Sequence, residues 1–110
     1  MATKEEKIQL YTEKLQELGY DVDAELLEKI VKMLWPSIYK LDAELVACSD
    51  NAERDRIVEN FLIKKLNLTD EPAGSLIESV NEVCEELKES RRKYRPVFYY
   101  ILAKKLNASL

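Results

Sequence analysis

Apolar residues recur at helical spacing along nearly the whole chain, and no segment alternates cleanly with period two. The longest apolar run, residues 97–103, is seven residues of uninterrupted aliphatic or aromatic character. On a helix such a run covers almost the full circumference, which is typical of a helix surrounded by others. Cations and then an asparagine follow in residues 104–107, as expected at a helix C-terminus. We therefore predict a central helix over residues 96–106, with Phe98 and Leu102 fully buried.

Start and stop residues predict further long helices before this one. Thr3 with Glu6 forms a capping box that starts the first helix, and Gly19 ends that helix at its C′ position. Asp23 caps the second helix, which Pro36 prevents from continuing.

A second capping box, Asp50 with Glu53, predicts the start of a helix that stops at Asn67. Residues 69–72, with their proline, give the next start signal. The helix behind it has a broad apolar face that includes Cys84.

The region between the second and third long helices is shorter and broken. One helical turn is expected at residues 36–39, and a short helix at 42–48. Such short elements argue against an up-down bundle, which needs long helices of matched length. We predict a single all-α domain over residues 1–110, with five to six helices packed at mixed angles around the 96–106 helix.

Charge is distributed unevenly along the chain. The net charge is −4, but residues 1–87 carry 10 Lys/Arg against 20 Asp/Glu, and residues 88–110 carry 7 against 1. Four cations crowd the start of the last helix, where the helix dipole disfavours them: Arg91, Arg92, Lys93 and Arg95. Carboxylates of the acidic body are the favoured partners of these cations. The alternative is that the cations stay exposed for an anionic partner.

The two cysteines, Cys48 and Cys84, are far apart in sequence, and the chain has no histidine. Zinc sites of the usual spacings are therefore excluded. No apolar run approaches 18 residues and the N-terminus lacks an apolar segment, so we expect no membrane span, no signal peptide and a cytoplasmic protein with reduced thiols. The sequence does not rule out a disulfide. We nevertheless predict that Cys84 is a buried, unreactive core residue that is not bonded to Cys48.

The sequence shows no recognisable catalytic arrangement. Without histidine a Ser-His-Asp or Cys-His site is impossible, and the isolated glycines do not form a phosphate-binding loop. We predict no catalytic, cofactor-binding or metal-binding residue. The favoured function is a non-catalytic helical module that binds another protein, as a monomer or weak homodimer. The alternative is an accessory binder of nucleic acid or another anionic ligand through residues 91–95, although the negative net charge disfavours nucleic acid.

Three blocks of sequence carry a resemblance to a known family. They are Pro36-Ser37-Ile38-Tyr39, Asn60-Phe61-Leu62 with Lys64-Lys65-Leu66, and Lys93-Tyr94-Arg95 with Val97-Phe98-Tyr99-Tyr100. Together they resemble, over nearly the whole chain, a family of small bacterial proteins catalogued only as a domain of unknown function. The family has Gly where this chain has Asn67 and Asn107, and a small residue where it has Pro96. The resemblance implies a small all-helical bacterial protein, with no assigned activity, catalytic residue or cofactor.

Overall fold

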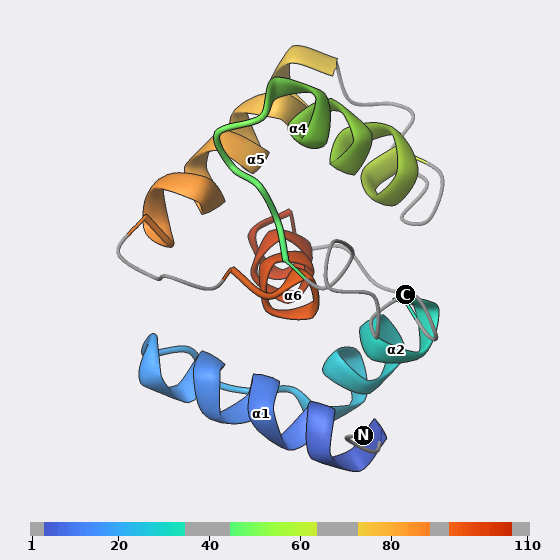
Figure 1. The fold of residues 1–110 in the computed structure, drawn as a ribbon, viewed down its shortest axis with the longest axis vertical. Helices are drawn as coiled ribbons and strands as arrows, with labels where there is room; N and C mark the ends of the chain where they lie inside the picture. Colours follow the sequence, from blue (N-terminus) through green and yellow to red (C-terminus); the bar gives the residue numbers. More distant parts are fainter. Residues whose placement is uncertain (1–3, 35–44, 64–72, 89–92, 107–110) are drawn as a thin grey trace.

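Figure 1 shows the helices of the computed structural model, which describes residues 4–34, 45–63, 73–88 and 93–106. These residues form five α-helices, one of which continues into a π-helical turn. In chain order the elements are α1 Lys4–Glu17, α2 Ala24–Leu34, α4 Asn51–Ile57 with the π-turn η2 Val58–Ile63, α5 Ala73–Glu86 and α6 Arg95–Lys105. The described residues contain no β-strand, so the predicted all-α fold is confirmed.

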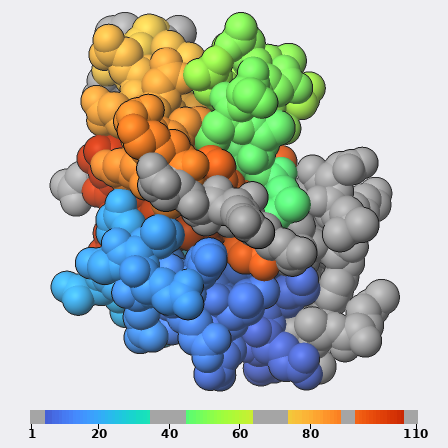
Figure 2. All heavy atoms as spheres, turned by 60° about the vertical axis from the view of Figure 1, so that its left-hand side comes forward, coloured from blue at the N-terminus to red at the C-terminus, as the bar shows by residue number. Residues whose placement is uncertain are grey.

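Helix α6 lies at the centre of the molecule. It is seen end-on in the middle of Figure 1, with α1 and α2 on one side and α4 and α5 on the other. In the space-filling view of Figure 2, only small parts of α6 show between α5 and α1. Every residue from Pro96 to Ala103 is buried, and Phe98 and Leu102 expose none of their surface. The prediction of a central, fully enclosed helix is confirmed.

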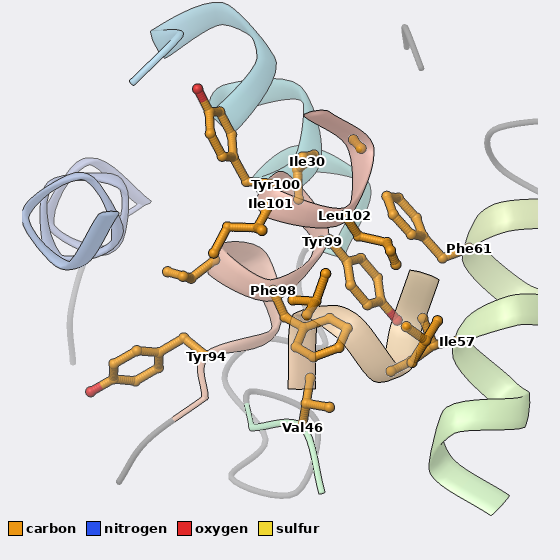
Figure 3. Close-up of a cluster of buried hydrophobic side chains, with 14 of the residues drawn as sticks. Ile30, Val46, Ile57, Phe61, Tyr94, Phe98, Tyr99, Tyr100, Ile101 and Leu102 are labelled. Atoms are coloured by element: carbon orange, nitrogen blue, oxygen red, sulfur yellow. The ribbon is translucent and has the colours of Figure 1, made fainter. Parts of the chain in front are cut away.

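Aromatic contacts join α6 and its leading residue to both sides of the molecule. Phe61 of η2 stacks on Tyr99 of α6, and both side chains are labelled in Figure 3. Their ring centroids are 4.0 Å apart and their interplanar angle is 15°. Tyr11 of α1 meets Tyr94, the residue just before α6, at 5.5 Å and 57°. Contacts of this kind add about 0.5–1.5 kcal/mol each beyond the burial of their area. Tyr94 and Tyr99 therefore connect the two sides of the molecule through ring contacts.

Gly19 ends α1 by adopting a left-handed backbone conformation. Its φ of 88° is a left-handed conformation that glycine adopts without steric cost. The Gly19 N–H donates to the Gln16 carbonyl at 3.0 Å, and the Tyr20 N–H donates to the Leu15 carbonyl at 3.0 Å. This pair of bonds is a Schellman motif, so the predicted C′ role of Gly19 is confirmed.

The start of α2 is fixed both locally and by α6. The Asp23 carboxylate accepts hydrogen bonds from the N–H groups of Glu25 and Leu26 at 3.1 and 3.3 Å, which confirms the predicted cap. The Tyr100 hydroxyl of α6 donates to the Asp21 carbonyl at 2.9 Å and accepts from the Asp23 N–H at 2.7 Å. The loop before α2 is thereby tied to the central helix.

The short helix predicted at 42–48 is wrong for the described part of that segment. Leu45 forms an isolated antiparallel bridge with Tyr94, and the Val46 N–H donates to the Lys93 carbonyl at 2.8 Å. Val46 is buried against the core. The extended backbone of residues 45 and 46 pairs with the backbone of residues 93 and 94, which lead into α6. This pairing between distant segments overrides the local helix propensity.

The start of α6 agrees with the sequence prediction. Tyr94 is the N-cap and Pro96 lies in the first turn, where its missing N–H costs little. Five features predicted from sequence lie outside the described residues. They are the cap at Thr3, the turn at 36–39, the helix end at Asn67, the start signal at 69–72 and the helix stop at Asn107.

Candidate functional site

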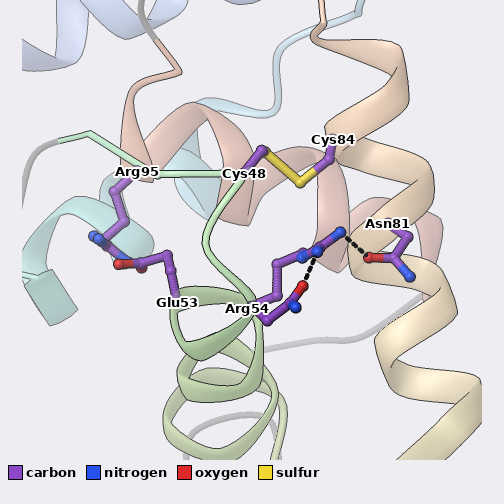
Figure 4. The surroundings of a disulfide bond; sticks show 7 residues. Cys48, Glu53, Arg54, Asn81, Cys84 and Arg95 are labelled. Carbon is purple, nitrogen blue, oxygen red and sulfur yellow. Dashed lines mark hydrogen bonds and ion pairs between the residues drawn. A yellow bond between two sulfur atoms is a disulfide. The ribbon is translucent and has the colours of Figure 1, made fainter.

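Arg95, the last cation of the predicted basic surface, points into the molecule. Its Nη1 lies 2.8 Å from Glu53 Oε1 of α4 and donates to the Tyr99 hydroxyl at 3.1 Å. Its Nη2 donates to the Leu45 carbonyl at 3.1 Å. Both charged side chains are mostly enclosed, with 13% of Arg95 and 11% of Glu53 exposed. Figure 4 shows the two side chains meeting between α4 and α6.

The surroundings of Arg95 keep it charged. Burial alone would lower the pKa of its guanidinium, but Tyr99 and Glu53 together more than offset this, and the pKa is raised. Burial also raises the pKa of the Tyr99 hydroxyl, an effect that Arg95 offsets only in part. Glu53 has a second cationic neighbour, because Arg56 Nη2 lies 3.2 Å from its Oε2. This network is an internal, charge-assisted connection between α4 and α6.

The structure describes only one other residue of the basic cluster, Lys93. Lys93 is partly buried and its carbonyl pairs with Val46, while Arg91 and Arg92 lie outside the described residues. The favoured prediction, partners from the acidic body, holds for Arg95. For Arg91 and Arg92 it stays a prediction. The sequence did suggest a local role for Glu53, as the closing residue of a capping box. Nothing local in the sequence indicates its ion pair with a residue 42 positions further on.

A disulfide joins Cys48 to Cys84, so the predicted absence of this bond is wrong. The two Cα atoms are 5.8 Å apart, within the range that a disulfide spans. Cys84 is half-buried at the edge of the apolar face of α5, and the extended segment before α4 brings the half-buried Cys48 beside it. The sequence prediction assumed a helix at 42–48. It also treated Cys84 as fully enclosed.

A second connection between α4 and α5 lies near the disulfide. The guanidinium of Arg54 donates from Nη1 to the Asn81 amide oxygen at 3.0 Å, and from Nη2 to the amide oxygen of Asn51. Figure 4 shows the bond between Arg54 and Asn81 below the disulfide, on the side of α4 away from Arg95. The disulfide and the Arg54–Asn81 bond together hold α4 against α5.

The surface between α4 and α5 is hollowed. Two adjoining hollows of about 340 and 260 Å³ share Asp55 and Ile77. Their described lining is Asn51, Arg54, Asp55, Val58, Gly74, Ile77 and Asn81. We call this surface the α4–α5 groove. Gly74 contributes no side chain, and a Cβ added there would meet no atom within 4 Å.

The charges of the α4–α5 groove differ from those beside α6. Arg56 and Arg95 both reach the carboxylate of Glu53, whereas the side-chain hydrogen bonds of Arg54 to described residues go to neutral amides. Among the described residues, no carboxylate lies within ion-pair distance of Arg54, and no cation within that distance of Asp55. Opposite charges at the edge of a hollow can recognise a partner with the reverse arrangement.

One other hollow among the described residues is lined on α1 alone. It measures about 440 Å³, and its lining is Glu5, Ile8, Gln9, Thr12, Glu13 and Gln16. Its described lining contains no lysine or arginine and comes from a single helix. The α4–α5 groove is therefore the better candidate site.

The fold and the groove define a class: a small all-α domain with a preformed surface groove between two of its helices. Residues 10–109 match the model of a family described as "Protein of unknown function (DUF2853)", and the chain belongs to this family. The match confirms the resemblance to a family of unknown function, and the bacterial origin stays a prediction. The chain matches no curated protein. No helix in the described part of the chain has the length and apolar character needed to cross a bilayer.

Proposed function

We propose that this protein is a non-catalytic helical module that binds a protein partner, and that the α4–α5 groove is the binding surface. One observation carries the proposal: Arg54 and Asp55 stand beside the half-buried Ile77 without ionic partners among the described residues. A partner that supplied opposite charges and apolar contact would satisfy all three. The cytoplasmic location stays a prediction, and the disulfide argues against the reduced thiols that were predicted with it.

Two features make the groove suitable for docking. The disulfide and the Arg54–Asn81 hydrogen bond connect the segments on its two sides, so little ordering is needed on binding. A groove between helices, with an apolar floor and polar edges, also suits the side chains of a helical segment. The alternative, anion binding at residues 91–95, is weakened because the Arg95 side chain is engaged inside the fold.

Substitution of Gly74 tests the proposal, because Gly74 lines the groove and a Cβ added there would meet no atom within 4 Å, so a longer side chain has room to occupy the groove. Tagged wild-type protein, Gly74→Gln and Ala24→Gln would each be used to capture proteins from a lysate of the native host, identified by mass spectrometry. Ala24 is an exposed residue at the start of α2, so Ala24→Gln is the matched control. Circular dichroism would confirm that all three are folded.

We expect wild type and Ala24→Gln to capture the same identified proteins, and Gly74→Gln to lose them. Equal capture by Gly74→Gln would refute the groove as the binding surface. If capture were insensitive to Gly74→Gln, fell steeply with salt and required Arg91 and Arg92, the anion-binding alternative would be correct.

A further inference from the structure

We infer that the occupant of the α4–α5 groove is a second copy of this chain, which docks through the same groove. The inference rests on the proposed function and names the partner. Its basis is that Arg54 and Asp55, adjacent in sequence, line one hollow and have no ionic partners among the described residues.

Adjacent opposite charges make the groove complementary to itself. In a two-fold dimer the same patch meets itself, so a residue on one copy contacts a different residue on the other, and the contact occurs twice. Arg54 of each copy then lies opposite Asp55 of the partner subunit. Two intermolecular ion pairs form, and they compensate both charges, which have no ionic partner among the described residues. A wholly acidic or wholly basic groove would repel its own copy.

The geometry of Arg54 favours this pairing. The amide oxygens of Asn51 and Asn81 hold its guanidinium at the groove without neutralising it. Hydrogen-bond donors remain available, because a guanidinium has five N–H groups and these bonds use two. A carboxylate from the second copy finds a guanidinium that is already positioned, so little side-chain entropy is lost on pairing.

The apolar part of the groove adds contact area to the dimer. Its small size limits how tightly two copies can bind. Ile77 is half-buried, and the open space at Gly74 leaves room for side chains of the other copy. Specific, stable interfaces bury roughly 800 Å² and about 20–30 residues per partner. The described lining of the groove is seven residues. We therefore expect a weak, reversible dimer.

Reversing the charge of Arg54 in one variant and of Asp55 in another tests the inference. Arg54→Asp places like negative charges opposite each other in a self-dimer, and Asp55→Arg places like positive charges opposite each other. A mixture of the two variants restores opposite charges at both contacts. Analytical ultracentrifugation would measure association up to about 1 mM protein, the weak end of specific binding.

The controls are Lys32→Asp and Glu28→Arg on α2, where both side chains are about half exposed. Each control changes the net charge of the protein by the same amount as the matching groove variant. The two control proteins therefore differ from each other in net charge as much as the two groove variants do. We expect wild type and both controls to dimerise, each groove variant to weaken dimerisation at least tenfold, and the mixture of groove variants to restore it. Gly74→Gln, with the charges unchanged, should also be monomeric.

A wild type that stays monomeric up to this concentration would overturn the inference, as would dimerisation that the groove variants leave unchanged. Failure of the mixed variants to associate would also overturn it. If wild type is monomeric while Gly74→Gln still loses identified proteins in the lysate capture, this inference fails and the proposed function stands. If Gly74→Gln affects neither self-association nor capture, both fail.

Discussion

On the side of α4 that faces α6, the carboxylate of Glu53 meets two guanidinium groups and is almost fully enclosed. On the side that faces α5, the neighbouring Arg54 is held by neutral amides, and Asp55 is exposed without an ionic partner among the described residues. Three consecutive charged residues on one short helix therefore have different surroundings. Glu53 serves the fold, because a buried charge is tolerated only when it is paired. The other two can serve a partner.

Four predictions follow from the different surroundings of these three residues, in order of decreasing effect on stability.

The largest expected effect concerns the core that both sides of the molecule share. Phe98→Ala removes a side chain with no exposed surface from the centre of α6. We expect a loss of about 3–5 kcal/mol in the free energy of unfolding, measured by urea denaturation. Ile77→Ala, in the half-buried groove floor, should cost clearly less, and equal losses would contradict the distinction between core and groove.

The second expectation compares the two sides of α4 directly. Glu53→Gln keeps the shape of the side chain but leaves the enclosed Arg95 charge without its carboxylate. We expect a loss of about 3–4 kcal/mol, because removing the charge of one partner from an enclosed ion pair is strongly destabilising. Arg54→Gln should cost about 1 kcal/mol or less, since the hydrogen bonds it removes are exposed. A reversed order in the same denaturation experiment would show that Arg54 is the structural residue.

The third expectation concerns the disulfide that holds the groove. Cys48 and Cys84 are 36 residues apart, so their bond restricts a long loop in the unfolded chain. Cys48→Ser with Cys84→Ser should lower the free energy of unfolding by about 2–4 kcal/mol. Reduction of the wild-type protein should have a similar effect. An intact mass showing both thiols free in the isolated, non-reduced protein would contradict the bond itself.

The smallest expectation is confined to alkaline pH. Burial raises the pKa of Tyr99 in the folded state above its ordinary value of about 10. Above that value the unfolded phenol ionises while the folded one keeps its proton, so stability is present below about pH 10 and falls as pH rises. Urea denaturation between pH 8 and pH 11 should show a shallower fall for Tyr99→Phe than for wild type. Identical slopes would mean that Tyr99 ionises as readily in the folded protein.

The sequence predicted features that depend on neighbours along the chain. The all-round apolar run identified α6, and the caps at Gly19 and Asp23 follow from the chemistry of those residues. The particular partners on distant segments were not predicted. The sequence favoured carboxylates as partners of Arg95 but did not indicate Glu53, and the disulfide was predicted to be absent. The ion pair of Glu53 with Arg95 and the disulfide of Cys48 with Cys84 both join segments more than 30 residues apart. Both depend on the extended path before α4, which local helix propensity does not indicate.

The same limit applies to the candidate site. Sequence drew attention to residues 91–95 because their charges are concentrated, yet the Arg95 side chain is enclosed. Arg54 and Asp55 are ordinary members of a mixed charge pattern in the sequence. Only the packing of α4 on α5 shows that neither has an ionic partner among the described residues.

The central claim, that the α4–α5 groove binds a second copy of this chain while the charges facing α6 hold the fold, is tested most directly by NMR. Backbone amide shifts of the purified wild-type protein would be recorded from dilute to concentrated solution. We expect concentration-dependent shifts confined to residues 51–63 and 73–86, with α1 and α2 unchanged. Shifts centred on α1 or α2, or none at any concentration, would contradict the account.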